Sequence, residues 1–224
     1  MRRLAALVLM LPLRASAQDP SPSPHWLVEL EASESFDNVQ RGTGLTHTFH
    51  SAHITLILDV ESPDVHDGQL RIKTARPQVI GAAGTFEGGR DATTRTSEAN
   101  LAYTATVRRD QVELALSYDG PERWALDFGI GLHAKGTNIA CIVDHARRTC
   151  ATSEVPPLAP FGWTLDAKHG GRITRQGDAW IVSYAHDDTD SAPGETRHHR
   201  ELAIRLRPRL PSDLNVVVAT PVFR

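Results

Sequence analysis

The fold is decided by residues 101–132, which read LAYTATVRRDQVELALSYDGPERWALDFGIGL. Three runs within this stretch place an apolar side chain at every second position, namely 101–107, 112–118 and 124–132. Alternation with a period of two is typical of a β-strand that buries one face. The breaks between the runs are short and polar, as hairpin turns are. The stretch therefore predicts an antiparallel meander of three strands.

Runs of the same kind recur on both sides of the meander, and no stretch of helix length keeps an apolar face. Strands are predicted near residues 26–31, 45–50, 53–60, 69–74, 78–83, 137–143, 149–152, 172–174, 179–185, 201–207 and 214–219. Residues 84–95, rich in Gly and Thr, and residues 187–196 are predicted to be loops. The expected fold is all-β, an antiparallel β-sandwich or small barrel built from hairpins and a meander.

The N-terminus has the three parts of a secretory signal peptide. Arg2-Arg3 give a positive start, residues 4–13 an apolar run, and Ala15-Ser16-Ala17 a small-x-small exit. The apolar run is too short for a helix that spans about 30 Å of hydrocarbon. We expect cleavage after Ala17, a proline-rich flexible leader over 18–24, and one all-β domain over 25–224. The mature protein is then periplasmic or secreted.

Composition and charge limit the classes of partner. The chain has 224 residues, of which 40% are hydrophobic and 23% charged, as in an ordinary globular protein. Its formal net charge is −3 at pH 7, and loss of Arg2, Arg3 and Arg14 with the signal peptide makes the charge more negative. Nucleic acid, which is bound through clustered basic residues, is therefore not an expected partner.

The two cysteines, Cys141 and Cys150, lie on neighbouring predicted strands on either side of a turn near residues 145–146. An oxidising compartment lets such a pair close, and facing positions across one hairpin predict a disulfide. The alternative, a redox-active or metal-binding pair, lacks the Cys-x-x-Cys spacing.

His47, His50 and His53 suggest a divalent-metal site, since neutral imidazole binds zinc, copper or nickel. On one continuous strand His47 and His53 share a face and His50 points away. A tight turn between the last two would instead make His50 and His53 cross-strand neighbours. A third ligand is then needed, and His198 or His199 is a candidate. The alternative is a set of surface histidines at a hairpin.

Asp187, Asp188 and Asp190 lie in a compact acidic stretch, and oxygen donors on alternate residues suggest a calcium site. The stretch lacks the glycine and the distal glutamate of the helix-loop-helix calcium pattern. The alternative is a solvated loop between two strands. A divalent metal, at the histidines or at this acidic stretch, is the one cofactor that the sequence suggests.

Common catalytic motifs are missing: the sequence has no Gly-x-Ser-x-Gly elbow, no His-Glu-x-x-His and no phosphate-binding glycine loop. An enzyme is therefore not favoured, although triads assembled from distant positions leave no such motif. Trp163 follows a proline-dense connector and is predicted to be exposed, where its ring would stack on a ligand such as a sugar.

These observations favour an exported, non-enzymatic β-sandwich or barrel that binds a ligand or an envelope partner of unknown identity. Two alternatives remain open. Residues 124–132 alternate as a lipid-facing strand does, which suggests an outer-membrane β-barrel and, with it, membrane association. The other alternative is a secreted enzyme of the jelly-roll kind, with carboxylates that converge only in the folded chain.

Overall fold

The computed structural model describes residues 25–61, 63–74, 76–144, 147–190, 194–210 and 212–213. The expected signal peptide and leader over 1–24 and the strand predicted at 214–219 lie outside the described residues. Nearly all of the described chain is β-structure, so the predicted all-β fold is confirmed. None of the helices in this part of the chain is long and apolar enough to cross a membrane.

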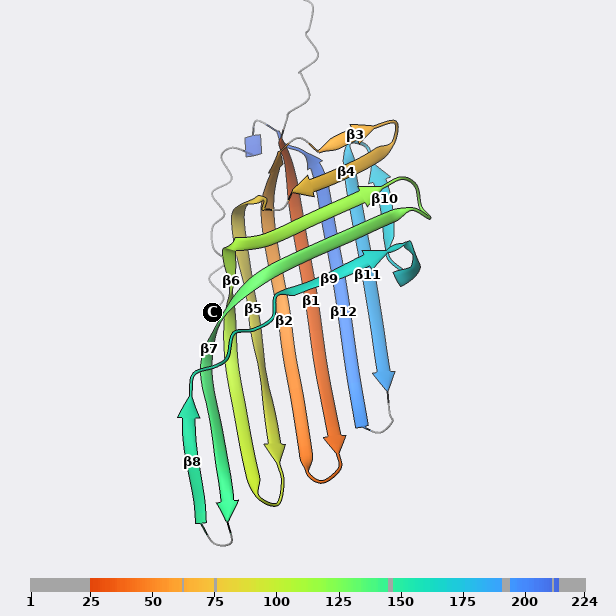
Figure 1. The fold of residues 1–224 in the computed structure, drawn as a ribbon. Coiled ribbons are helices and arrows are strands. Elements are labelled where there is room, and N and C mark those ends of the chain that lie inside the picture. The colour runs from red at the N-terminus through yellow and green to blue at the C-terminus, as the bar shows by residue number, and fades with distance from the viewer. Residues whose placement is uncertain are drawn as a thin grey trace, which may run out of the picture.

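One antiparallel sheet contains all the strands of the described residues. The elements are β1 (His25–Arg41), β2 (Leu45–Glu61), β3 (Asp64–His66), β4 (Gln69–Thr74), β5 (Gln78–Thr93), β6 (Ser97–Tyr118), β7 (Trp124–Asp144), β8 (Arg147–Ser153), β9 (Phe161–Asp166), a 3₁₀ helix (Ala167–His169), β10 (Arg172–Gln176), β11 (Ala179–Asp190) and β12 (Gly194–Pro208). The strand order is β10-β11-β12-β1-β2-β5-β6-β4-β3, and β7 pairs with β6, β8 and β9. The sheet curls strongly and forms a half-barrel (Figure 1).

The bend in β6 and β7 divides the molecule into two halves. Up to Ala105, β6 pairs with β5, and from Leu114 on it pairs with β4. The register of β6 against β7 shifts between Val107 and Val112, where the bend lies. As a result β4, the end of β6, the start of β7 and β9 cross in front of β1, β2 and β12 (Figure 1). We call this two-layered part the packed half, and the single-layered continuation of the long strands the open half.

The core fills the packed half and follows the alternation of the strands. On β1 the buried apolar side chains in one phase are Trp26, Val28, Leu30 and Ala32. Aromatic contacts join the two layers: the ring centroids of Tyr118 on β6 and Trp180 on β11 are 4.9 Å apart. Each large side chain buried in this way contributes about 2 kcal/mol to folding. We call the face of the long strands that bears the core the inner face, and the opposite one the outer face.

Several predictions about strand boundaries are wrong, among them the division of β7 into separate strands at 124–132 and 137–143. The runs 101–107 and 112–118 are one bent strand, because the polar residues between them form an irregularity in the ladder and not a hairpin turn. Strand β2 is continuous from Leu45 to Glu61, so there is no turn between His50 and His53. Most of the predicted loop at 84–95 belongs to β5.

The glycines of β5 explain why this strand resembled a loop. A Cβ on Gly88 would lie 2.6 Å from the Tyr103 hydroxyl oxygen, and a Cβ on Gly89 would lie 2.8 Å from Phe49 Cζ. Aromatic rings of the neighbouring strands thus cross β5 on both faces, where only glycine leaves them room. Glycine marks a close approach here, and not a break in the sheet.

Cys141 and Cys150 form the predicted disulfide. They face each other directly in the register of β7 and β8. Cys141 is buried, whereas every residue of β8 is exposed. The disulfide therefore fastens an exposed strand to the sheet in the open half.

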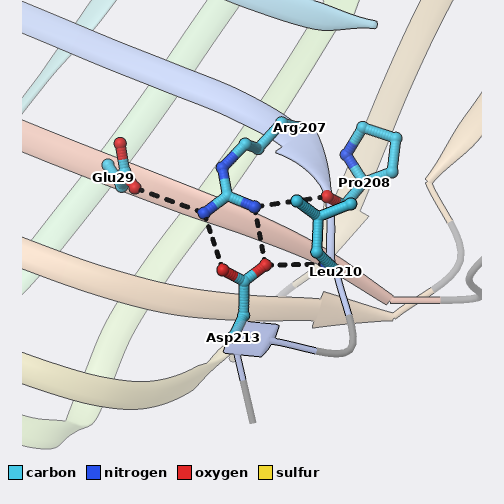
Figure 2. A network of polar contacts seen from close by, with 5 residues as sticks. All are labelled: Glu29, Arg207, Pro208, Leu210 and Asp213. Atoms are coloured by element: carbon cyan, nitrogen blue, oxygen red, sulfur yellow. Dashed lines mark hydrogen bonds and ion pairs between the residues drawn. The ribbon is translucent and has the colours of Figure 1, made fainter. Parts of the chain in front are cut away.

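Asp213, one of the few described residues after β12, is anchored to the outer face of the packed half (Figure 2). Arg207 donates from both terminal nitrogens to Asp213, from Nη1 to Oδ2 at 2.6 Å and from Nη2 to Oδ1 at 2.9 Å. The Leu210 amide donates to Asp213 Oδ2 at 2.7 Å, and Glu29 Oε1 lies 3.7 Å from Arg207 Nη2. The hydrogen bonds from Arg207, followed by that from the Leu210 amide, lower the pKa of Asp213 to about 2.

Candidate functional site

A band of ionisable and aromatic side chains crosses the inner face where the packed half ends. This inner band consists of Glu34, Phe36, His50, Phe86, Tyr103, His198 and Arg200. The strand register assembles it, since Glu34 of β1 pairs with Arg200 of β12, and Phe36 pairs with His50 of β2 and His198 of β12. These positions keep the phase of the buried residues on the same strands, so their side chains lie on the inner face.

Glu34 is the centre of the band and one of its least exposed members, with 7% of its surface accessible. Its Oε1 accepts hydrogen bonds from Arg200 Nε at 2.9 Å and from His198 Nε2, and its Oε2 lies 3.6 Å from His50 Nε2. Burial alone would raise the pKa of Glu34, but the hydrogen bonds from His50, His198 and Arg200 lower it to about 2. The carboxylate is therefore ionised at neutral pH.

Arg200 is held in place by two contacts that leave its end unused. Its Nε donates to Glu34, and its Cζ lies 5.6 Å from the centroid of the Trp163 ring, in a cation–π contact. Its two terminal nitrogens make no hydrogen bond to any other described residue, and one third of the side chain is exposed. Arg200 thus presents two oriented donor nitrogens at the border between the packed and the open half.

A row of rings lies beside this charge cluster. His50 stacks on Phe36 with 5.2 Å between the ring centroids, and on Phe86 with 6.0 Å between them. Phe86 stacks in turn on Tyr103 at 6.2 Å, and burial raises the pKa of the Tyr103 hydroxyl. His198 meets Phe36 edge to face at 5.4 Å. The band therefore combines an apolar, aromatic surface with a cluster rich in hydrogen-bond donors.

The structure separates the three histidines that the sequence grouped. On the continuous strand β2, His50 lies on the inner face, whereas His47 and His53 lie on the outer face. His47 Nε2 is 3.0 Å from an oxygen of Asp37, and His53 Nε2 is 3.6 Å from an oxygen of Glu31. The pairing of His50 with His53 around one ion is therefore wrong.

His198, which the sequence offered only as a candidate third ligand, does lie near His50. Both imidazoles approach the same carboxylate, that of Glu34. The Arg200 guanidinium on that carboxylate would repel a metal ion. No group of three His, Cys, Asp or Glu side chains within the described part of the chain is arranged to hold a metal ion.

The acidic stretch is a strand and not a loop. β11 runs through all three positions, so the side chains of Asp187 and Asp188 lie on opposite faces, and the side chain of Asp190 lies outside the described part of the chain. Asp187 lies on the outer face, where its Oδ1 is 2.6 Å from His199 Nδ1. Asp188 pairs in register with His198 and lies on the inner face. The strand therefore keeps these two carboxylates apart, whereas the predicted calcium loop would have brought them together.

Trp163 is buried, with 6% of its surface exposed, and the prediction of an exposed stacking platform is wrong. Its ring centroid lies 5.3 Å from that of Phe128 and 5.6 Å from that of Phe161. Its role near the band is indirect, since its face carries the Arg200 guanidinium. The connector before β9 leads into the layer of strands that crosses in front of β1, β2 and β12, and this brings Trp163 into the core.

Sequence reasoning missed Glu34 and Arg200, although a signal for both is present. Glu34 occupies the next position in the buried phase of β1 after Ala32. Arg200 does the same on β12, two residues before the buried Leu202. A charged residue in the buried phase of a strand is unusual and marks either a paired cluster or a site.

Neither the models of known protein families nor the curated proteins include a match to this chain.

Proposed function

We propose that this protein is an exported binding protein whose inner band takes up a ligand with an anionic group and an aromatic or apolar body. The anionic group, a carboxylate, sulfonate or phosphate, would accept hydrogen bonds from the terminal nitrogens of Arg200. The apolar body would lie along Phe36 and Phe86. Binding, and not catalysis, is the activity proposed.

One observation carries the proposal: the donors at the end of Arg200 are oriented but have no partner among the described residues. Planar guanidinium groups bind carboxylate and phosphate through two parallel hydrogen bonds. Glu34 and Trp163 restrict the motion of Arg200 before a ligand arrives, which reduces the entropy lost on binding. The imidazoles of His50 and His198 add further donors beside the guanidinium when they are protonated.

Export belongs to the same proposal. It is supported by the signal-like pattern of the first 17 residues, and the Cys141–Cys150 disulfide is compatible with an oxidising compartment. Protein released from the periplasm by osmotic shock should have Gln18 as its first residue, by N-terminal sequencing. Recovery of a chain that begins at Met1 would contradict export with cleavage.

The binding site can be tested with two fluorescent probes that share an aromatic body. Anilinonaphthalene sulfonate carries the anionic group, and N-phenyl-naphthylamine lacks it. Arg200→Gln should weaken binding of the sulfonate by about tenfold, the value of one charged hydrogen bond, and leave the neutral probe unaffected. Arg205→Gln, an exposed arginine on the outer face of the same strand, is the matched control. Equal losses for the two probes, or no loss for either, would overturn the proposal.

A further inference from the structure

A second polar site lies on the outer face, on the opposite side of the same sheet. It is a groove of about 600 Å³ whose lining residues come from β2, β1, β12 and β11 and from the start of β10. The strand register places four lining residues in one row across the sheet: Glu31, Ala203, Ser183 and Arg172. Glu31 and Arg172 are thus three strand spacings apart, about 14 Å between their backbones.

The floor of this outer groove is formed by small side chains. Ala203 and Ser183 lie between the two charged ends of the row. The adjacent row adds Ser33 and Ala185, which pair with Glu201 from either side. In the first row no bulky side chain therefore stands between Glu31 and Arg172. The hydroxyls of Ser33 and Ser183 can bond to polar groups of a ligand that lies across the strands.

The two ends of the groove have opposite charge. At one end Glu31 and Glu201 are more than half exposed, and their ion-pair partners are His53 at 3.6 Å and His199 at 3.5 Å. At the other end Arg172 is exposed and makes no hydrogen bond or ion pair with another described residue. An ammonium group suits the first end, and a carboxylate suits the second.

We propose that the outer groove binds a short peptide with free termini, its ammonium group at Glu31 and Glu201 and its carboxylate at Arg172. The backbones of Glu31 and Arg172 are about 14 Å apart, or about three strand spacings, and a hydrogen bond of about 3 Å to a terminal group of the peptide takes up part of this distance at each end. An extended tripeptide, at about 3.4 Å per residue, spans about 10 Å and fits this gap. A single amino acid, at about a third of that length, cannot reach both ends. The groove is independent of the inner band, because the two lie on opposite faces.

The test uses trialanine, which has both free termini, with N-acetyl-trialanine and trialanine amide as probes that lack one charge each. Titration of the exported protein, with its whole mature chain, should show binding of trialanine by amide chemical shifts or calorimetry. Loss of either terminal charge should weaken binding by about fivefold, the upper range for one exposed ion pair. Equal binding of all three probes, or no binding of trialanine, would overturn the proposal.

Variants assign each end of the peptide. Arg172→Gln should weaken binding of trialanine by about fivefold but leave binding of trialanine amide unchanged. Glu31→Gln should likewise weaken binding of trialanine but leave binding of N-acetyl-trialanine unchanged. Arg205→Gln and Glu113→Gln, two exposed residues outside the groove, are the matched controls. Both test positions are exposed, so thermal unfolding should confirm that the variants remain folded. Equal effects of Arg172→Gln on trialanine and on its amide would contradict the assigned orientation.

Discussion

Arg200 and Arg207 lie on the same strand, and each pairs with a carboxylate, yet they use different atoms. On the inner face Arg200 donates to Glu34 from Nε alone. On the outer face Arg207 donates to Asp213 from both terminal nitrogens (Figure 2). The pKa of each carboxyl is lowered to about 2. The two carboxylates are therefore similar, and the pairs differ in which guanidinium nitrogens are bonded to the carboxylate.

The pair of Arg207 with Asp213 is closed, whereas the pair of Arg200 with Glu34 is open. A closed pair satisfies its own donors and holds two segments of the chain together. An open pair uses part of its donors to fix the arginine and leaves the rest for another molecule. We therefore expect changes in the closed pair to affect stability alone, and changes in the open pair to affect binding as well.

The largest effect is expected for Glu34→Ala. It leaves Arg200, His50 and His198 at the edge of the core without their carboxylate, which should lower the free energy of unfolding by about 3 kcal/mol. Urea unfolding followed by circular dichroism measures this loss. A loss below about 1 kcal/mol would show that water takes the place of the carboxylate in the variant, and that the open pair does not order the band.

Acid should lower the free energy of unfolding, because the open pair is lost when Glu34 takes up a proton. Its pKa is lowered from 4.5 to about 2 in the folded protein, so the unfolded chain binds a proton first as the pH falls. The contribution of the ionised Glu34 to the free energy of unfolding is fully present above pH 4.5. It is lost between pH 4.5 and about 2, by about 3 kcal/mol in total. Urea unfolding across this range should show a smaller decline for Glu34→Gln than for the wild type. Identical declines would assign the acid sensitivity to other groups.

A smaller effect is expected for Asp213→Asn in the closed pair. The substitution removes the charge that Arg207 contacts and should cost about 2 kcal/mol of stability, the value of a charged hydrogen-bonded pair that is partly buried. Differential scanning calorimetry should record the lowered melting temperature. Binding of the sulfonate probe should be unchanged. A weaker affinity for the probe would contradict the claim that the closed pair affects stability alone.

Local pattern was enough to predict the strands but not where the chain bends or continues. The alternation over 101–132 was visible, whereas the irregularity at 108–111 has the same polar residues as a turn. Gly88 and Gly89 suggested a loop because the rings that cross them come from other strands. Local propensity cannot distinguish a turn from a bulge when the deciding contact is distant in sequence.

The inner band depends on contacts that sequence spacing does not reveal. Glu34 and His198 are 164 positions apart, and only the pairing of β1 with β12 brings them together. What the sequence does contain is their phase, since both continue the buried positions of their strands. Polar residues in the buried phase of a strand are unusual, but the partner of each such residue follows from the topology of the sheet.

The most direct test compares Arg200→Gln with Arg207→Gln in two measurements on the same samples, titration of the sulfonate probe and urea unfolding. The two-pair comparison predicts that Arg200→Gln weakens the probe by about tenfold, whereas Arg207→Gln leaves its affinity unchanged and lowers stability by about 2 kcal/mol. Equal loss of probe affinity in both variants, or full affinity in Arg200→Gln, would contradict the claim that the unused donors of Arg200 bind an anion.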